Sequence, residues 1–409
     1  MTQAGPRDRM KSRLIIVLVV CTVLMSARAA AQIANVRLYG SINLDLEFVR
    51  GATCNALAPP GCGAPGNELQ NPTVVRVSSN SSRFGIRGNE YLGRGQVAIF
   101  QIESDFWGDT GGGTIAGRET YVGLQGDWGT FKLGHFLTPY DDLLPIFGNA
   151  PTLTTSILST AAIWAQGPLS KVQGGFDARL GNSIRYETLP MNGFVGELQY
   201  STRDAAADAD VDTANNGDHA SELRRANVVG FGAFYSKGPL DFGIAYERNN
   251  KVRAETFNDD AFSIAVAYDF GFASPSVGPR LAVVYERLRY DTINNELSHA
   301  DLKRDFWGIS ATVPVGGGSI YAFWGRAGDG RGSAVDGTSI GGLTKGPGSA
   351  SDQWEVSYSF PLSLRTLLYA GFVRINNQKN AGYGFNINDY PVAPGARPTG
   401  YVFGMAHFF

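Results

Sequence analysis

The chain has 409 residues and a formal net charge of −2, with 52 glycines and 11% aromatic residues. A charge so close to zero excludes the basic footprint of a protein that binds nucleic acid along its whole surface. Abundant Gly, Tyr and Phe favour pleated strands and tight turns over helices, so an all-β fold is expected.

The first 31 residues have the parts of a secretory signal peptide. Basic residues within 9–13 precede an unbroken apolar run over 14–25, and a stretch of small residues ends at Ala31. The apolar run is too short to cross a bilayer as a helix, which takes roughly 20 residues. We expect cleavage after Ala31, which leaves a mature domain over 32–409 whether translation starts at Met1 or at Met10.

Two cysteines remain after the signal is removed, Cys54 and Cys62, and they lie close together in the sequence. In an oxidising periplasm this pair predicts one disulfide that closes a small surface loop. Two free thiols are the alternative. The spacing lacks the paired Cys-x-x-Cys partners of a zinc site.

The mature chain opens with a long alternation of apolar and polar residues from Val36 to Phe48. A period of two is the mark of a strand, and this strand is longer than the roughly 5–6 residues of an average soluble strand. Strands of membrane barrels need about 9–11 tilted residues to cross the hydrocarbon. The alternation returns at 240–247, 262–270 and 354–360. In a closed barrel with an aqueous lumen, the apolar face of each strand meets lipid and the other face meets water.

Sixteen such segments are present, an even number as a single-chain bacterial barrel requires. Short turns alternate with long polar loops, which is the pattern of periplasmic turns and outer loops. The predicted strands are 36–49, 73–88, 94–106, 116–126, 129–137, 182–188, 193–202, 226–236, 239–249, 260–270, 278–289, 304–314, 317–326, 351–360, 364–375 and 400–409. The predicted long loops are 50–72, 203–225, 290–303, 327–350 and 376–399.

One connection differs from the other loops, because residues 138–181 are rich in apolar side chains. A connection of this length without a strand is usually functional. Its apolar stretches, at 144–148 and 152–162 and at Trp164, predict that it packs against the inner wall of the barrel.

Eight short stretches add a further signal through their order and spacing: 38–40, 82–90, 98–104, 121–124, 128–134, 138–141, 182–186 and 364–369. Together they resemble the trimeric general porins of Gram-negative bacteria, particularly the betaproteobacterial type, over the length of the mature chain. The resemblance implies a 16-stranded antiparallel transmembrane β-barrel whose third loop folds inward and narrows the lumen.

The same resemblance implies a function and a set of partners. The expected function is a passive, water-filled diffusion channel for small hydrophilic solutes and ions in the Gram-negative outer membrane. The expected partners are two further copies in a homotrimer, outer-membrane lipid and lipopolysaccharide, and the barrel assembly machinery during biogenesis. No cofactor is expected.

Alternation and family position together direct four arginines toward the lumen, Arg37, Arg83, Arg87 and Arg185. Arginine keeps its charge at any physiological pH and pairs readily with carboxylate or phosphate groups. We expect these side chains and Glu103 to line the constriction. The alternative for any one arginine is an ordinary structural pairing with a lumenal carboxylate.

Two departures from the family pattern bear on ion selectivity. His135 stands where the family commonly has another arginine, and strict alternation from Leu133 turns it outward. The inward loop has Asp141 beside Asp142 at its root and no acid between Leu143 and Phe176. A weak anion preference is therefore expected, with Asp141 at the constriction.

The last strand ends in an aromatic carboxyl terminus, and its apolar residues occupy alternate positions. This pattern resembles the signal that the outer-membrane assembly machinery reads. An ordinary strand that happens to end the chain is the alternative. The residues concerned are Tyr401, Phe403, Met405 and Phe409.

Other functions are disfavoured by the sequence. It has four histidines but neither a Gly-x-Ser-x-Gly nor a His-Glu-x-x-His motif, so no enzyme is expected. Asp208, Asp210 and Asp212 lack the glycine and closing glutamate of a calcium loop, so we expect a solvated acidic loop and no metal. A substrate-specific channel, or else a non-conducting adhesin or structural barrel, remains the alternative.

Overall fold

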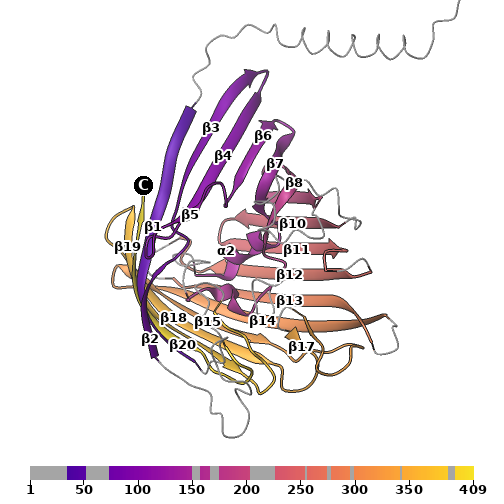
Figure 1. Ribbon diagram of the computed structural model, residues 1–409. Coiled ribbons are helices and arrows are strands. Elements are labelled where there is room, and N and C mark those ends of the chain that lie inside the picture. The colour runs from indigo at the N-terminus through magenta and orange to yellow at the C-terminus, as the bar shows by residue number, and fades with distance from the viewer. Residues whose placement is uncertain are drawn as a thin grey trace, which may run out of the picture.

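The computed structural model describes residues 35–51, 73–149, 157–165, 175–202, 226–253, 256–273, 278–294, 299–340, 343–385 and 392–409. Within these ranges sixteen strands form a closed antiparallel barrel, because each strand pairs with the next and β20 pairs with β1 (Figure 1). The sixteen are β1 (Asn35–Arg50), β3 (Arg83–Gly93), β4 (Gln96–Phe106), β6 (Thr120–Gly126), β7 (Gly129–Leu137), β8 (Arg179–Glu187), β9 (Phe194–Ser201), β10 (Asn227–Lys237), β11 (Leu240–Asn250), β12 (Asn258–Asp269), β13 (Arg280–Ile293), β14 (His299–Val315), β15 (Gly318–Ala327), β18 (Ser351–Pro361), β19 (Thr366–Asn377) and β20 (Thr399–Phe408). The predicted 16-stranded barrel is confirmed.

Four shorter strands accompany the barrel. β2 (Thr73–Ser79) and β3 both pair with β1, so they continue one another across an interruption at 80–82. The predicted single strand over 73–88 is therefore broken, and Ser81 has a φ of 53° at the break. β5 (Gly113–Thr114) pairs with β4, while β16 (Ser339–Ile340) and β17 (Leu343–Thr344) form a small hairpin.

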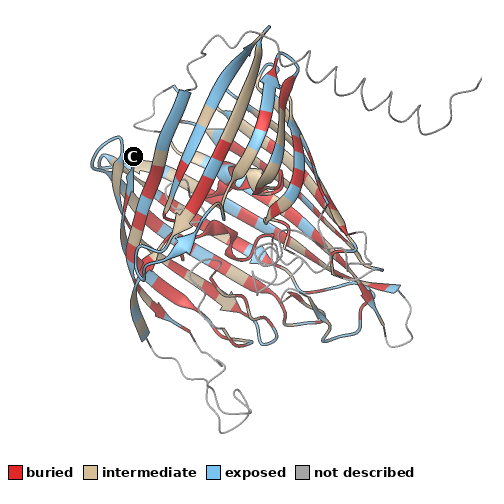
Figure 2. Cartoon of the chain, turned by 45° about the horizontal axis from the view of Figure 1, so that its top comes forward, coloured by how far each residue is buried: buried red, intermediate tan, exposed pale blue. Residues whose placement is uncertain are grey.

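Side chains alternate between the two faces of the wall as the sequence predicts. On β1 the outward Leu38 and Ile42 are exposed, whereas the intervening Ser41 and the inward Asn43 are buried. Figure 2 shows the same change between buried and exposed residues along most strands. No helix among the described residues is long and apolar enough to cross a membrane.

Two strands are longer than predicted, and the predicted long loop at 290–303 is wrong. β13 runs to Ile293 and β14 begins at His299, so only five residues join them. The alternation continues beyond the apolar band with charged residues in place of apolar ones, as in 287–291. A prediction from apolar residues alone therefore ends β13 too early and begins β14 too late.

The inner face of the barrel is not in contact with water along all of its strands, as the alternation alone would predict. On the wall formed by β11–β15 the inward side chains include Ala245, Val284, Leu288, Phe306 and Phe323, all buried. They belong to one hydrophobic cluster with residues of the inward connection. One wall of the barrel therefore has a dry core between the sheet and the loop that covers it.

Candidate functional site

The connection between β7 and β8 enters the barrel through three short helical segments. These are η1 (Asp141–Leu143), α2 (Leu144–Phe147) and η2 (Thr160–Ala162). α2 lies against β11, β12 and β13 on the inner side of the wall (Figure 1). Leu143, Phe147 and Trp164 are fully buried there. Apolar burial of this kind, worth about 1.5–3 kcal/mol for each large side chain, holds the segment on the wall.

Glycines on the inner wall make room for this segment. A Cβ at Gly243 would stand 2.6 Å from the Leu143 side chain, and one at Gly400 would stand 2.3 Å from Ile157. At either position a Cβ would require the facing side chain to move. The two glycines therefore let the loop approach the wall closely.

A buried ion pair fixes two points of the loop. Glu286 on β13 accepts hydrogen bonds from the Tyr140 hydroxyl at 3.0 Å and from the Ala165 backbone N–H at 2.7 Å. Its other carboxylate oxygen accepts from Arg304 on β14 at 2.8 Å, and both charged side chains are fully buried. Glu286 thus joins the start of the loop, its later part and the wall.

A second anchor lies on β18, where Glu355 accepts a hydrogen bond from the Asn149 amide at 2.9 Å. Nearby, the Tyr321 hydroxyl donates to the Phe147 carbonyl at 2.8 Å, and the Gln353 amide donates to the Ser159 carbonyl at 2.9 Å. The described parts of the loop therefore contact strands from β11 to β20. The opposite wall, formed by β1, β3 and β4, faces the remaining lumen.

That opposite wall has a cluster centred on Glu103 of β4. Arg118 pairs with Glu103 at 2.6 Å and Arg83 lies 3.8 Å from it. The Tyr39 hydroxyl donates to the same carboxylate at 2.9 Å. Arg83 and Glu103 thus form the structural pairing that the sequence left open as the alternative to a role at the constriction. Arg118 was not identified from the sequence because it precedes the alternating part of its strand.

Arg37 and Arg87 stand opposite one another in the pairing of β1 with β3, so their side chains share the inner face. The Arg87 guanidinium lies 4.8 Å from the centre of the Tyr39 ring, a cation–π contact. Both arginines are exposed. Among the described residues no carboxylate forms an ion pair with either one within 4 Å.

Arg185 has a different environment, since it is only 7% exposed. Its guanidinium pairs with Asp142 at the root of the loop, with Glu197 of β9, and with Glu187 at 3.0 Å. Three carboxylates around one arginine make it a structural charge that holds the loop root to the wall. Glu197 was missed from the sequence, although it alternates with Gln199 and Ser201 on one face of β9.

Asp141 lies beside this root, partly buried. Desolvation, followed by the nearby charges of Asp177 and Asp142, raises the pKa of the Asp141 carboxyl well above its ordinary value, while Arg179 opposes the shift. His135 stands opposite Thr120, which in turn stands opposite the exposed Ile102, so the register directs His135 outward. The structure therefore gathers Asp141 but not His135 with the lumenal charges.

The remaining predicted residues lie elsewhere. Cys54 and Cys62 are outside the described residues. Tyr401, Phe403 and Met405 are half exposed on the outer face of β20. Phe409 exchanges two backbone hydrogen bonds with Gly40 of β1, at 3.0 and 3.1 Å, which close the barrel.

Comparison with known proteins gives consistent findings. Residues 17–380 match the family model described as Gram-negative porin. The outer membrane porin protein 32 of Delftia acidovorans is 24% identical over 405 residues, covering 96% of this chain and 99% of that protein. An outer membrane porin of Bordetella pertussis is 24% identical over 371 residues, covering 82% of this chain and 84% of that protein.

Among solved structures, the anion-selective porin from Comamonas acidovorans superposes with a TM-score of 0.66 at 21% identity. The match covers 92% of this chain and 100% of that one. At this identity the likeness establishes the fold.

Proposed function

The chain belongs to the family of Gram-negative porins, and from that premise we propose that its barrel is a weakly anion-selective channel that residues 138–181 narrow. It is an outer-membrane channel of a Gram-negative bacterium, through which small hydrophilic solutes and ions diffuse passively. The anion preference and the narrowing by this loop are the parts that need a test.

The observation that supports the anion preference is an imbalance of charge between the loop and the wall it faces. Arg37 and Arg87 share the inner face of β1 and β3. The loop has no Asp or Glu between Leu143 and Phe176 to face them. Cations without opposing acids attract anions into a water-filled neck. The Comamonas acidovorans porin is itself described as anion-selective, which supports the same preference here.

Single-channel recording in planar bilayers under a salt gradient tests the proposal. The wild-type protein should conduct with a reversal potential of anion sign, and the double variant Arg37→Gln/Arg87→Gln should shift that potential toward cations. Arg94→Gln/Lys237→Gln removes two exposed cations from the short turns and serves as the control, with a smaller shift expected. A cation-selective wild type contradicts the assignment, and a protein without conductance favours an adhesin or structural barrel.

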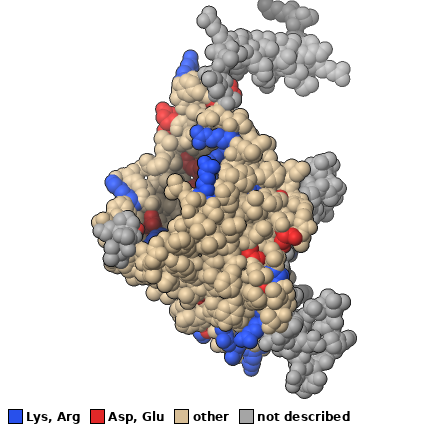
Figure 3. Space-filling view, turned by 90° about the vertical axis from the view of Figure 1, so that its left-hand side faces the viewer, with Lys and Arg blue, Asp and Glu red and all other residues tan. Residues whose placement is uncertain are grey.

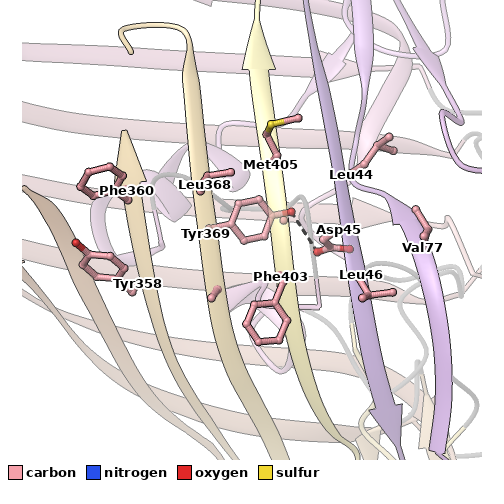
Figure 4. Close-up of a pocket in the computed structure, with 12 residues that line it drawn as sticks. Leu44, Asp45, Leu46, Val77, Tyr358, Phe360, Leu368, Tyr369, Phe403 and Met405 are labelled. Atoms are coloured by element: carbon pink, nitrogen blue, oxygen red, sulfur yellow. Dashed lines mark hydrogen bonds between the residues drawn. The ribbon is translucent and has the colours of Figure 1, made fainter. Parts of the chain in front are cut away.

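The outer surface supports a homotrimer. An apolar groove of about 720 Å³ lies on the outer face of β1 and β18–β20, lined by side chains that include Leu44, Leu368, Phe403 and Met405 (Figure 4). Figure 3 shows this side of the molecule, with cations gathered at its lower end, the end of the long loops. A solved outer membrane protein of Vibrio cholerae with a similar fold is described in a trimer form. We expect three copies to bury this groove in a trimer. Native mass spectrometry should show a trimer for the wild type and fewer trimers for Phe403→Asp, which puts a charge into the groove.

The other expected features belong to the same proposal. Residues 1–31 act as a signal peptide that is removed, Cys54 and Cys62 form a disulfide, and the assembly machinery inserts the barrel into a membrane that contains lipopolysaccharide. Intact mass measurement of the purified protein tests two of these features together. It should give the mass of 32–409 less two hydrogens, and a mass that includes the first 31 residues would contradict the cleavage.

A further inference from the structure

A polar groove of about 450 Å³ lies at the end of the barrel that carries the long loops. It is formed by the connection that contains β16 and β17 and by the connection from β19 to β20 (Figure 1). Its volume falls within the roughly 300–1,000 Å³ of sites for small molecules. Charged, hydroxyl and amide side chains line it, which is unlike the apolar groove on the outer face of β18–β20. We name it the loop groove.

The floor of the loop groove is the backbone of residues 346–348. A Cβ at Gly346 would stand 3.5 Å from the carboxyl carbon of Asp336, and one at Gly348 would stand 3.1 Å from the Lys379 side chain. Both glycines have a positive φ, 113° and 79°, a conformation that favours glycine. Asp336 therefore lies above one end of this short turn and Lys379 above the other.

The two loops are fixed to one another at this floor. The Asn380 backbone N–H donates to the Gly348 carbonyl at 2.8 Å, and its side-chain amide donates to the Pro347 carbonyl at 2.9 Å. The β16–β17 hairpin is anchored on its other face, where Leu343 is fully buried. The loop groove is thus formed before a ligand arrives, which lowers the cost of ordering on binding.

The charges that line the loop groove do not balance. Lys345 donates to Asp336 at 2.9 Å, so one ammonium is paired with one carboxylate. Lys379 is exposed and forms no ion pair with a carboxylate of the described residues. An ammonium without a partner beside a neutral pair favours a ligand that carries a negative charge.

The uncharged side chains of the loop groove suit hydroxyl groups. Ser339 and Thr344 stand opposite one another in the hairpin and share one face, and the Thr344 hydroxyl donates to Ser339 at 3.3 Å. Each hydroxyl retains further hydrogen-bonding capacity. The Asp336 side chain is 72% exposed, so its carboxylate can accept from a ligand hydroxyl. Pro347 and Pro394 add apolar surface for the C–H groups of a polyol.

We propose that the loop groove binds small polyhydroxylated anions of the sugar-acid class. The carboxylate of the ligand meets Lys379 and Lys345, and its hydroxyl groups meet the hairpin. The site deepens the proposed function and rests on it, because a solute held at the mouth of an anion-selective channel enters the lumen from a raised local concentration. Binding should be weak, with a Kd on the order of 1 mM, since a channel must also release its solute.

Ligand-observed saturation-transfer NMR with gluconate tests the site on the refolded protein in detergent. The lumenal arginines also attract anions, so every protein is measured in the Arg37→Gln/Arg87→Gln background. Adding Lys345→Gln/Lys379→Gln should lower the affinity for gluconate about 10-fold, because each exposed ion pair contributes roughly a factor of three. Adding Arg94→Gln/Lys237→Gln instead removes two exposed cations from the short turns and should leave the affinity unchanged. Equal affinities of the two variants would overturn the proposal.

Two simpler probes separate recognition of hydroxyl groups from attraction of charge. Acetate has the carboxylate alone and glucose has the hydroxyl groups alone, so each should bind more weakly than gluconate does. Adding Ser339→Ala/Thr344→Val should lower the affinity for gluconate and leave that for acetate unchanged. If acetate binds as tightly as gluconate, the loop groove attracts anions without recognising a polyol, and the proposal fails.

Conductance distinguishes a failure of the site from a failure of the channel. The loop groove lies at the loops and not at the constriction, so Lys345→Gln/Lys379→Gln in the otherwise wild-type protein should conduct potassium chloride as the wild type does. A wild type that binds gluconate at the loop groove but does not conduct would refute the channel and the role in uptake, and would leave the binding site standing. A conducting protein in which the lysine substitutions do not weaken gluconate binding would refute the site alone.

Discussion

Arg185 should contribute strongly to the stability of the barrel. It is 7% exposed and pairs with three carboxylates, of which Glu187 also pairs with Lys132 at 2.6 Å. Replacing Arg185 leaves the charges of Asp142 and Glu197 close together. Breaking a buried ion pair from one side costs about 3–5 kcal/mol, so Arg185→Gln should lower the free energy of unfolding by roughly that amount.

Urea unfolding in detergent micelles measures this loss. Arg326→Gln is the matched control, because the Arg326 side chain is 45% exposed and pairs with Asp352 at 3.0 Å. Exposed pairs contribute about 0–1 kcal/mol, so the control should unfold nearly as the wild type does. Equal losses in the two variants would contradict a structural role for Arg185.

Asp141 should make ion selectivity depend on pH. Burial and neighbouring acids raise the pKa of its carboxyl, so the group stays neutral above its ordinary pKa and ionises as the pH rises further. Its contribution to folding stability is complete below the ordinary pKa and is lost as the pH rises through the raised one. The anion preference should fall over the same range, because a negative charge then appears at the loop root.

Reversal potentials measured between about pH 4 and pH 8 check this expectation. Asp141→Asn should reduce the dependence. His135→Gln should leave it unchanged, since the register directs His135 away from the lumen. A wild type whose reversal potential does not change with pH would count against the raised pKa.

At the scale of residues, alternation predicts which face a side chain occupies but not which charges meet. It placed Arg37, Arg83, Arg87 and Glu103 on one face, as the register has them. It did not distinguish the exposed Arg87 from Arg185, which three carboxylates surround. That difference depends on which residues of the loop and of other strands lie near each arginine. The spacing of residues along one strand does not give those distances.

At the scale of elements, the inward loop should depend on Glu286 for its position. Glu286 binds Tyr140, Ala165 and Arg304 through its two oxygens. Glu286→Gln puts an amide N–H₂ in place of one acceptor and leaves Arg304 without a charge partner among these contacts. We expect a noisier single-channel current and a loss of about 3–5 kcal/mol in unfolding free energy.

Glu355→Gln is the comparison for this experiment. Glu355 accepts hydrogen bonds from the neutral Asn149 amide and the Thr160 hydroxyl, and no arginine of the described residues forms an ion pair with it. Glutamine can therefore keep the bond from Asn149 with its remaining oxygen. Its effect on the current and on unfolding should be smaller. A quiet Glu286→Gln channel with wild-type stability would show that apolar packing alone holds the loop.

Most elements could be predicted because alternation and turn signals are local. The exceptions share a physical cause. β13 and β14 extend past the lipid with charged side chains, where the pattern of apolar residues stops but the backbone pairing continues. The apolar side chains of residues 138–181 predict packing on the inner wall, but they do not predict which strands face them. That depends on where a loop distant in sequence lies along the barrel.

At the scale of the whole molecule, the ring of strands is closed by its two ends. β20 pairs with β1 from Ser41 opposite Phe408 to Arg50 opposite Thr399, and Phe409 adds two backbone hydrogen bonds to Gly40. The Phe409 ring also covers Gly40, since a Cβ there would stand 2.4 Å from it. Phe409 therefore helps to close the barrel, and we propose that it is also part of the assembly signal.

Two variants separate these tasks. Phe409→Ala keeps the backbone bonds and removes the ring, whereas deletion of Phe409 removes both. If the aromatic end is read by the assembly machinery, Phe409→Ala should refold in detergent nearly as well as the wild type but reach the outer membrane in cells at a much lower level. Deletion should impair both processes. Heat-modifiable gel mobility measures folding, and quantification in isolated outer membranes measures assembly. Normal assembly of Phe409→Ala would show that the aromatic ring is not part of an assembly signal and that the last strand is an ordinary one.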